Sequence, residues 1–217
     1  MTDLVEFEAE PPAAALIFGL HIEQARKYAF LLARDSEIFG LLGPRELPKI
    51  WSRHVLNSAL LVELVPEGSK VADIGSGAGL PGIPMAIARP DCSFTLIEPM
   101  ERRANWLLST VSELGLTNVE VLRSRAEDVQ RTDFDIVTAR AVAALDKLLR
   151  MLTPLTRGSV HKTVLAMKGS RAPIEIEEAG PRIKRLGFST PEIITLGEGV
   201  APETATVVRI KLAESES

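Results

Sequence analysis

The chain has 217 residues, of which 46% are hydrophobic and 25% are charged, a composition typical of a globular protein. No run of about 18 apolar residues predicts a membrane span, and the acidic N-terminus lacks the basic start of a secretory signal. A single cysteine, Cys92, excludes an internal disulfide framework and a CxxC metal site, so we expect a cytoplasmic protein without a metal.

The charge is unevenly distributed along the chain. Four acidic residues and no basic ones lie within the first 20 positions, and they equal the whole net charge of −4. The rest of the chain is neutral on balance. Any nucleic-acid site must therefore be a local basic patch rather than a generally basic surface.

Residues 1–66 are expected to form an N-terminal helical extension, a cap without strands. Apolar residues predict helical structure over 13–34, which Gly19 divides, and a stronger helix from about Glu46 to Val65. Gly43-Pro44 precedes this second helix and Pro66-Glu67-Gly68 ends it.

Residues 67–217 are expected to form one compact α/β domain. Strands are predicted at Lys70–Ile74, Ser93–Glu98, Val119–Arg123, Phe134–Ala139, Thr163–Lys168, Ser189–Leu196 and Thr204–Leu212. Helices are predicted at Gly82–Ala88, Met100–Leu114, Ala144–Leu155 and Pro173–Leu186. The alternation predicts a mostly parallel sheet with helices on both faces, but only seven residues join the last two strands, which therefore form an antiparallel hairpin. This seven-stranded arrangement is typical of the Rossmann-like class I S-adenosylmethionine-dependent methyltransferases.

A glycine-rich loop, VADIGSGAG, follows the first strand at 71–79. Gly75, Gly77 and Gly79 allow positive φ and the close approach of a ligand. The segment GAGLPG, with Gly77, Gly79 and Gly82, also matches G-x-G-x-x-G. That match begins four residues after Asp73, and two prolines crowd the turn, which disfavours a dinucleotide. Because Asp73 can hold an amino-acid end directly or through water, we favour S-adenosylmethionine over a nicotinamide cofactor.

Two further segments are candidates for cofactor contacts. Glu98 ends the second strand, where a carboxylate can accept hydrogen bonds from both ribose hydroxyls, although nicotinamide enzymes use the same arrangement. Ala126 and Glu127 follow the third strand and are expected beside the adenine, with a helix N-cap role as the alternative for Glu127.

Arg140 follows the fourth strand and Lys168 ends the fifth, so both are expected in the active-site crevice. The segment at Arg140 lacks the Asn- or Asp-Pro-Pro-aromatic motif of enzymes that methylate exocyclic amines. Guanine N7 needs no general base, and these two side chains could hold its O6 edge or phosphates. Alternatively, they pair with carboxylates such as Asp73.

Other basic residues could extend this face toward RNA. We include His54 among them, although a histidine on the cap helix is more often packed or on the surface than catalytic. The predicted RNA-binding residues are Arg53, His54, Arg102, Arg103, Arg125 and Lys168.

These segments resemble the bacterial 16S ribosomal RNA (guanine-N7)-methyltransferases, a family also called glucose-inhibited division protein B. The motifs are RHVLNS at 53–58, DIGSGAGLPGIP at 73–84, RSRAED at 123–128, ARA at 139–141 and MKG at 167–169. The resemblance implies S-adenosylmethionine-dependent methylation of a guanine in the 530 loop of 16S rRNA, with an effect on streptomycin response. It also implies that Gly75, Leu80, Ala126, Glu127 and Arg140 contact the cofactor.

The expected partner is therefore 16S rRNA or the small ribosomal subunit, with no membrane or DNA partner and a monomeric enzyme. A loop target is required, because the deep major groove of an RNA duplex hides guanine N7. Three alternatives stay open: a small-molecule methyltransferase, a nicotinamide oxidoreductase, and a cofactor-gated ribosome-assembly factor. The sequence does not decide between naked rRNA and an assembled subunit.

Overall fold

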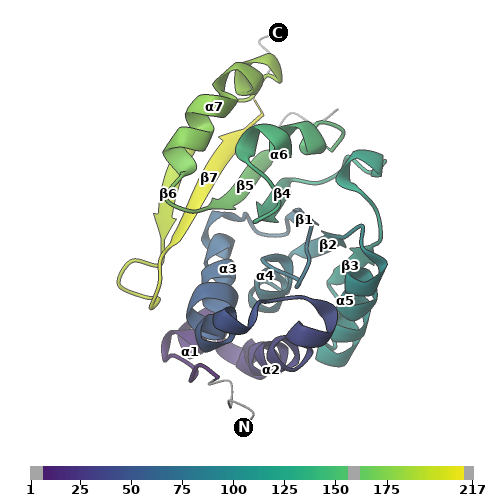
Figure 1. Ribbon diagram of the computed structural model, residues 1–217, viewed down its shortest axis with the longest axis vertical. Helices are drawn as coiled ribbons and strands as arrows, with labels where there is room; N and C mark the ends of the chain where they lie inside the picture. Colours follow the sequence, from purple (N-terminus) through teal and green to yellow (C-terminus); the bar gives the residue numbers. More distant parts are fainter. Residues whose placement is uncertain (1–6, 156–161, 213–217) are drawn as a thin grey trace.

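A seven-stranded sheet forms the centre of the molecule in the computed structural model, which describes residues 7–155 and 162–212. The strand order is β3-β2-β1-β4-β5-β7-β6, with β1 to β5 parallel and β7 antiparallel to both of its neighbours (Figure 1). The strands are β1 (Lys70–Ile74), β2 (Ser93–Ile97), β3 (Val119–Leu122), β4 (Ile136–Arg140), β5 (Thr163–Lys168), β6 (Glu192–Leu196) and β7 (Ala205–Lys211). The predicted mostly parallel sheet with a C-terminal hairpin is confirmed.

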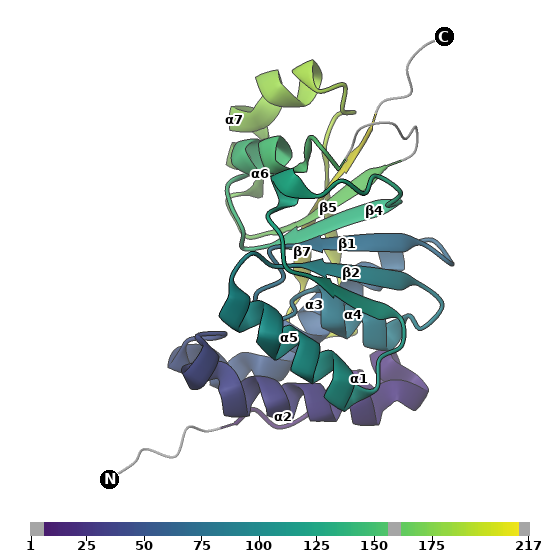
Figure 2. The same cartoon turned by 90° about the vertical axis from the view of Figure 1, so that its right-hand side faces the viewer.

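Helices cover both faces of the sheet (Figure 2). They are α4 (Gly82–Ala88) and α5 (Glu101–Leu114) on one face, and α6 (Leu145–Leu152) and α7 (Ala172–Arg185) on the other. Side chains alternate along β1: Ala72 and Ile74 join the core beneath α6 and α7, whereas Val71 joins the core on the α4 side. This alternation directs the Asp73 side chain toward α4, where its carboxylate meets the backbone of Gly82.

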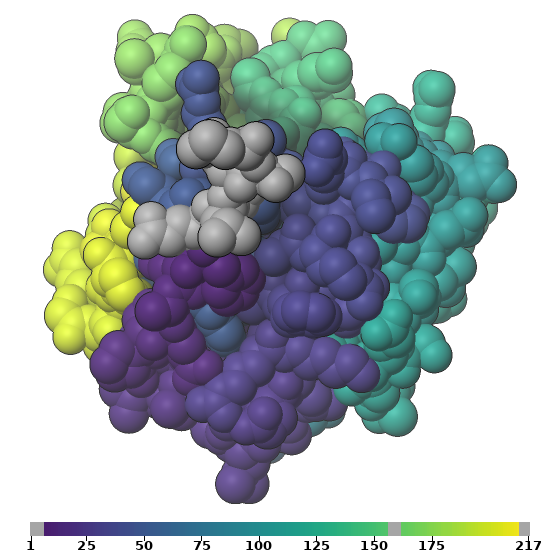
Figure 3. All heavy atoms as spheres, turned by 60° about the horizontal axis from the view of Figure 1, so that its bottom comes forward, coloured from purple at the N-terminus to yellow at the C-terminus, as the bar shows by residue number. Residues whose placement is uncertain are grey.

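The N-terminal cap packs on the same face as α4 and α5. It consists of α1 (Ala13–Phe18), η1 (Gly19–His21), α2 (Ile22–Phe39), η2 (Pro44–Lys49), η3 (Ile50–Leu56), α3 (Asn57–Ala59) and η4 (Leu60–Leu64). In the space-filling view the purple and blue residues of this cap lie between the yellow hairpin and the teal residues of the sheet domain (Figure 3). Among the described residues, no helix combines the length and apolar character needed to cross a membrane.

The prediction of one regular helix over 46–65 is wrong in its local geometry. The segment passes from 3₁₀ turns through a π-helical segment, Ile50–Leu56, to a short α-helix and 3₁₀ turns again. Pro48 lies inside the first of these segments and has no N–H to donate to a helical hydrogen bond. Nearly every side chain from Ile50 to Leu61 is buried, so the apolar pattern indicates a helical segment without fixing its hydrogen-bond register.

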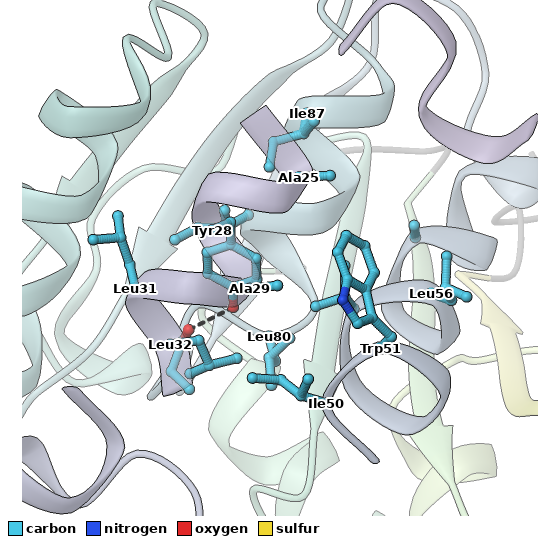
Figure 4. Close-up of a cluster of buried hydrophobic side chains, with 14 of the residues drawn as sticks. Ala25, Tyr28, Ala29, Leu31, Leu32, Ile50, Trp51, Leu56, Leu80 and Ile87 are labelled. Atoms are coloured by element: carbon cyan, nitrogen blue, oxygen red, sulfur yellow. Dashed lines mark hydrogen bonds between the residues drawn. The ribbon is translucent and has the colours of Figure 1, made fainter. Parts of the chain in front are cut away.

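The cap supports the glycine-rich loop directly. The fully buried Tyr28 of α2 donates a hydrogen bond from its hydroxyl to the carbonyl oxygen of Ala78 at 2.7 Å, drawn as a dashed line in Figure 4. Trp51 and Leu80 lie in the same apolar cluster (Figure 4). The loop is therefore held by contacts with both the cap and the sheet.

Two glycines allow the loop to pack closely on its surroundings. A Cβ added to Gly79, whose φ is +82°, would lie 2.4 Å from Ile83 Cδ1. A Cβ on Gly82 would lie 2.3 Å from Leu96 Cδ2 and 2.7 Å from the Asp73 carboxylate. Both contacts are much shorter than van der Waals separation, so α4 can approach β1 and β2 only because position 82 has no side chain.

Gly82→Ala is therefore expected to lower the free energy of unfolding by about 1–3 kcal/mol through overpacking. Urea denaturation would measure the change. Gly43→Ala is the matched control, because Gly43 has a negative φ and no atom within 4 Å of the added Cβ. Equal stability of the two variants would contradict this close packing.

Candidate functional site

Three cavities lie along the carboxyl ends of the five parallel strands, β1 to β5. We name them the Glu98 cavity, about 660 Å³, the loop cavity, about 230 Å³, and the Lys168 cavity, about 650 Å³. The two larger volumes fall within the range of small-molecule sites. Carboxyl ends of parallel strands are where ligands bind in open α/β sheets, so the topology alone favours this edge.

The Glu98 cavity brings together residues from three strand ends. Its walls include Gly75 after β1, Glu98 after β2, and Ala126 and Glu127 in η5 (Ala126–Asp128) after β3. Apolar side chains (Ile97, Met100, Val142 and Met151) and basic side chains (Arg103, Arg125 and Lys147) also line it. These four polar and small predicted residues, distant in sequence, thus border one space.

Glu98 is fixed by the backbone around it. Its side chain is buried, with Oε2 accepting from the Gly77 N–H and Oε1 from the Met100 N–H, each at 2.9 Å. Each carboxylate oxygen can accept more than one hydrogen bond. The carboxylate is therefore oriented in advance and keeps acceptor capacity toward the cavity.

The loop cavity continues from the Glu98 cavity across Gly75. Gly77, Leu80, His54 and Arg140 also line it. Gly75 and Gly77 have φ values of +64° and +55°, a conformation that glycine adopts without strain. The loop can therefore present backbone groups to a ligand lying along both cavities.

The Lys168 cavity lies beyond the loop cavity, toward β5 and α7. Arg53, Arg140, Lys168 and Glu175 are among its lining residues. The Lys168 Nζ donates to the carbonyl oxygen of Ala143 at 2.6 Å and pairs with Glu175 Oε2 at 2.8 Å. The alternative of an ion pair is thus realised for Lys168, but its carboxylate partner is Glu175 rather than Asp73.

Arg140 connects the sheet to the cap. Its guanidinium donates to the carbonyl oxygens of Arg53 and His54, to Ser58 Oγ at 2.8 Å and to His54 Nδ1 at 2.8 Å. Because Nδ1 accepts from a guanidinium, the imidazole proton is assigned to Nε2, which donates to Glu46 at 2.9 Å. Burial and the Arg140 charge lower the pKa of His54 to about 4, so the ring is neutral near pH 7.

Ala141 stands at the junction of all three cavities. It lines each of them, and Arg140 lines the loop and Lys168 cavities beside it. Its φ of +55° makes it the one non-glycine residue with positive φ among those described. This left-handed turn brings Val142 back to Gly75, where a Cβ on the glycine would lie 2.9 Å from Val142 Cγ2. Such strain, which costs about 1–2 kcal/mol, is often found at functional sites.

Asp73 lies beneath the loop and Gly79 within it, and their predicted cofactor contacts, direct or through water for Asp73, stay predictions. The Asp73 side chain has no exposed surface, and its Oδ2 accepts from the Gly82 N–H at 3.1 Å beneath the loop. Gly79 packs against Ile83 and Leu107. The structure gives both residues internal positions that shape the loop rather than walls of the described cavities.

The predicted RNA-binding residues occupy different environments. Arg53, Arg102 and Arg125 are exposed, and Arg53 lies 3.5 Å from the Glu46 carboxylate. Arg103 is half-buried and donates to the Gly40 carbonyl oxygen at 2.8 Å. His54 is 6% exposed with both ring nitrogens hydrogen-bonded, so it is an internal residue and not a surface contact.

Comparisons with known proteins place this geometry in a family. The family model described as "GidB: rRNA small subunit methyltransferase G" matches residues 21–201. The ribosomal RNA small subunit methyltransferase G of Pseudarthrobacter chlorophenolicus is 50% identical over 203 residues, covering 93% of each chain. This chain belongs to the rRNA small subunit methyltransferase G family. The protein of the same name from Clavibacter sepedonicus is 46% identical and covers 98% of this chain and 100% of its own.

Solved structures share the fold of this methyltransferase G family member. A SAM-dependent methyltransferase from Aquifex aeolicus superposes with a TM-score of 0.56 and 19% identity, covering 72% of this chain and 90% of that one. M. jannaschii TYW2 in complex with AdoMet gives a TM-score of 0.55 and 18% identity, covering 73% and 74%. The predicted Rossmann-like methyltransferase fold is confirmed.

The sequence of this methyltransferase G family member did not single out Glu175. Its signal is weak, because an acidic residue in the first turn of a helix is ordinary stabilisation of the helix dipole. Only its pairing across to Lys168 and to the N-terminus of α6 reveals that it lines a cavity. The sequence also carries no signal for the hydrogen bond from Tyr28 to the glycine-rich loop, because an aromatic residue on an apolar helix face indicates only a place in the core.

The buried Asp73 predicts a measurable pH dependence of stability. Burial raises the pKa of Asp73 to about 7, and the Glu98 carboxylate adds to the rise. The folded state then keeps a proton that the unfolded state, with a pKa of 3.8, has lost. This group therefore destabilises the fold progressively as pH rises from about 4 to about 7.

Asp73→Asn removes this titration. The free energy of unfolding of the variant relative to the wild type should therefore increase between pH 4 and pH 7 and then level off. Urea denaturation of both proteins at several pH values, without added ligand, measures the difference. A difference that stays constant across this range would contradict the assignment.

Proposed function

We propose that this enzyme transfers a methyl group from S-adenosyl-L-methionine to N7 of a guanine in the 530 loop of 16S rRNA. The observation that carries the proposal is the junction at Arg140 and Ala141, where two cavities suited to the cofactor meet a third that borders on basic side chains. Membership in the rRNA small subunit methyltransferase G family supports the rRNA substrate.

The Glu98 and loop cavities fit the chemistry of the cofactor. Glu98 offers an oriented carboxylate for the two ribose hydroxyls, and Ala126 and Glu127 lie across the same cavity for the adenine. Gly75, Gly77, Leu80 and Arg140 surround the adjoining space for the amino-acid end. The cofactor supplies an electrophilic methyl group on a positively charged sulfur.

The transfer itself requires placement rather than proton transfer. The N7 lone pair of guanine forms the new bond to the methyl carbon while the carbon–sulfur bond breaks. The electron pair of the broken bond stays on sulfur. N7 carries no proton to be removed, so no general base is needed. The chain must hold N7 in line with the methyl group, and Ala141 marks the junction where the cavities proposed for the two reactants meet.

The target guanine must be unpaired or splayed out. An RNA duplex hides N7 in its deep major groove, whereas a loop can present one base to the Lys168 cavity. The exposed Arg53, Arg102 and Arg125 are proposed to hold the RNA backbone around that base. We further propose that the enzyme acts as a monomer in the cytoplasm, on 16S rRNA or on the small ribosomal subunit.

Labelled S-adenosylmethionine tests the function directly. The purified enzyme is incubated with naked 16S rRNA, assembled small subunits or no RNA, and the labelled nucleoside is identified after digestion. We expect label only with RNA and only as N7-methylguanine from one position. Transfer to a small molecule without RNA, or RNA binding without transfer, would contradict the proposal.

Glu98→Ala is expected to weaken cofactor binding at least about 100-fold, because it removes two charge-assisted hydrogen bonds that contribute about 1.5–3 kcal/mol each. Isothermal titration with S-adenosylmethionine measures the dissociation constant. Glu101→Ala is the control, since Glu101 is an exposed carboxylate three residues further on that faces Arg123. Unchanged affinity in Glu98→Ala would remove Glu98 from the proposed site.

A further inference from the structure

An ion pair on the wall of the Lys168 cavity has free hydrogen-bonding positions on both partners. Glu175, in the first turn of α7, uses Oε2 for both of its contacts: the Lys168 Nζ and the Leu145 N–H, each at 2.8 Å. Within the described part of the chain, Oε1 has no hydrogen-bond partner, and it is not sealed from solvent. One oxygen is thus fixed by the fold while the other is available in the cavity.

Lys168 is complementary to this arrangement. Its ammonium group has three donors, of which one goes to Ala143 and one to Glu175. Only 9% of the Lys168 side chain and 16% of the Glu175 side chain are exposed, so both groups are held in place. Burial by itself raises the pKa of Glu175, but the hydrogen bonds from Lys168 and the Leu145 N–H hold it below its usual value, which keeps the carboxylate ionised.

The pair therefore presents one donor beside one acceptor. Guanine offers the matching edge, with the acceptor O6 next to the donor N1–H. Adenine has the opposite order, a donor amino group next to the acceptor N1, whose lone pair would face the carboxylate. A pair of fixed polarity can therefore accept one purine and reject the other.

We propose that the Lys168–Glu175 pair is the base-reading site of the enzyme, with Lys168 donating to O6 and Glu175 Oε1 accepting from N1–H of the target guanine. This inference rests on the proposed function. The specificity-determining residue that it adds is Glu175.

The position of N7 agrees with this orientation. In guanine, O6 lies between N1 and N7, so N7 falls on the Lys168 side of the base. Lys168 contacts Ala143, two residues from Ala141, where the three cavities meet, whereas Glu175 contacts Leu145, four residues from it. A base read by Glu175 and Lys168 therefore has N7 toward the junction from which the methyl group would come.

The first test changes the base and leaves the wild-type protein intact. Small-subunit rRNA is prepared by ligation with guanine, inosine or 2-aminopurine at the methylated position, and kcat/KM for methyl transfer is measured. Inosine keeps O6 and N1–H and is expected to react within about threefold of guanine. 2-Aminopurine keeps N7 but lacks both groups, and is expected to react at least about tenfold more slowly.

The second test changes the protein. Glu175→Gln keeps the size of the side chain and an oxygen for Leu145, but replaces the free acceptor with an amide donor. We expect kcat/KM on guanine RNA to fall at least about tenfold, the preference for guanine over 2-aminopurine to shrink, and cofactor affinity to stay unchanged. Glu177→Gln, an exposed residue of the same helix, is the matched control and should behave as the wild type.

The outcomes separate the two levels of the account. If the wild type methylates no guanine N7 in any rRNA, the proposed function fails and the base-reading site fails with it. If guanine is methylated but 2-aminopurine reacts equally well, only the base-reading site is overturned. A Glu175→Gln variant that loses rate equally on both bases shows that Glu175 acts solely through helix packing, and this also overturns the inference. The base series decides the question if that variant does not fold.

Discussion

The half-buried guanidinium of Arg140 joins the two parts of the chain that make the site. It leaves the end of β4 and donates to groups on η3 and α3, segments more than 80 positions earlier. Because these hydrogen bonds satisfy the donors of a partly desolvated charge, moving the cap away from the sheet would leave those donors without partners and cost free energy. The cap is therefore part of the site's construction as well as a cover for the sheet.

The contacts of Arg140 with the cap also explain the left-handed turn at Ala141. With Arg140 held toward the cap, the chain must reverse at once to reach α6, and Ala141 takes a left-handed conformation to do so. The reversal places Val142 against Gly75 and the Ala143 carbonyl oxygen against Lys168. One strained residue thus brings the cofactor-side cavities and the Lys168 cavity to a shared wall.

Much of the fold follows from the sequence because it depends on local patterns. The strands at Lys70–Ile74 and Thr163–Lys168 and the helix at Gly82–Ala88 have the predicted ends, since buried strands and proline-marked helix starts leave clear signals. The segment Glu46–Val65 was harder, because burial on all sides does not distinguish π and 3₁₀ turns from an α-helix.

Site residues could be predicted from the sequence where they are of a characteristic type and directly follow a predicted strand. Gly75, Glu98 and Ala126 were predicted from their places in the topology, and they border one cavity. Asp73 was placed at the right strand end, but side-chain alternation turns it under the loop. Glu175 depends on a contact between α7 and β5, and no pattern along the chain reports such a long-range pair.

A crystal structure with S-adenosylhomocysteine tests the central claim most directly, because the cofactor is assigned to the Glu98 and loop cavities and the target base to the Lys168 cavity. The account predicts the ribose on Glu98, the adenine toward Ala126, and the sulfur beside Ala141 with the Lys168 cavity left open. A nucleoside lodged between Lys168 and Glu175, or a sulfur pointing away from Ala141, would contradict it.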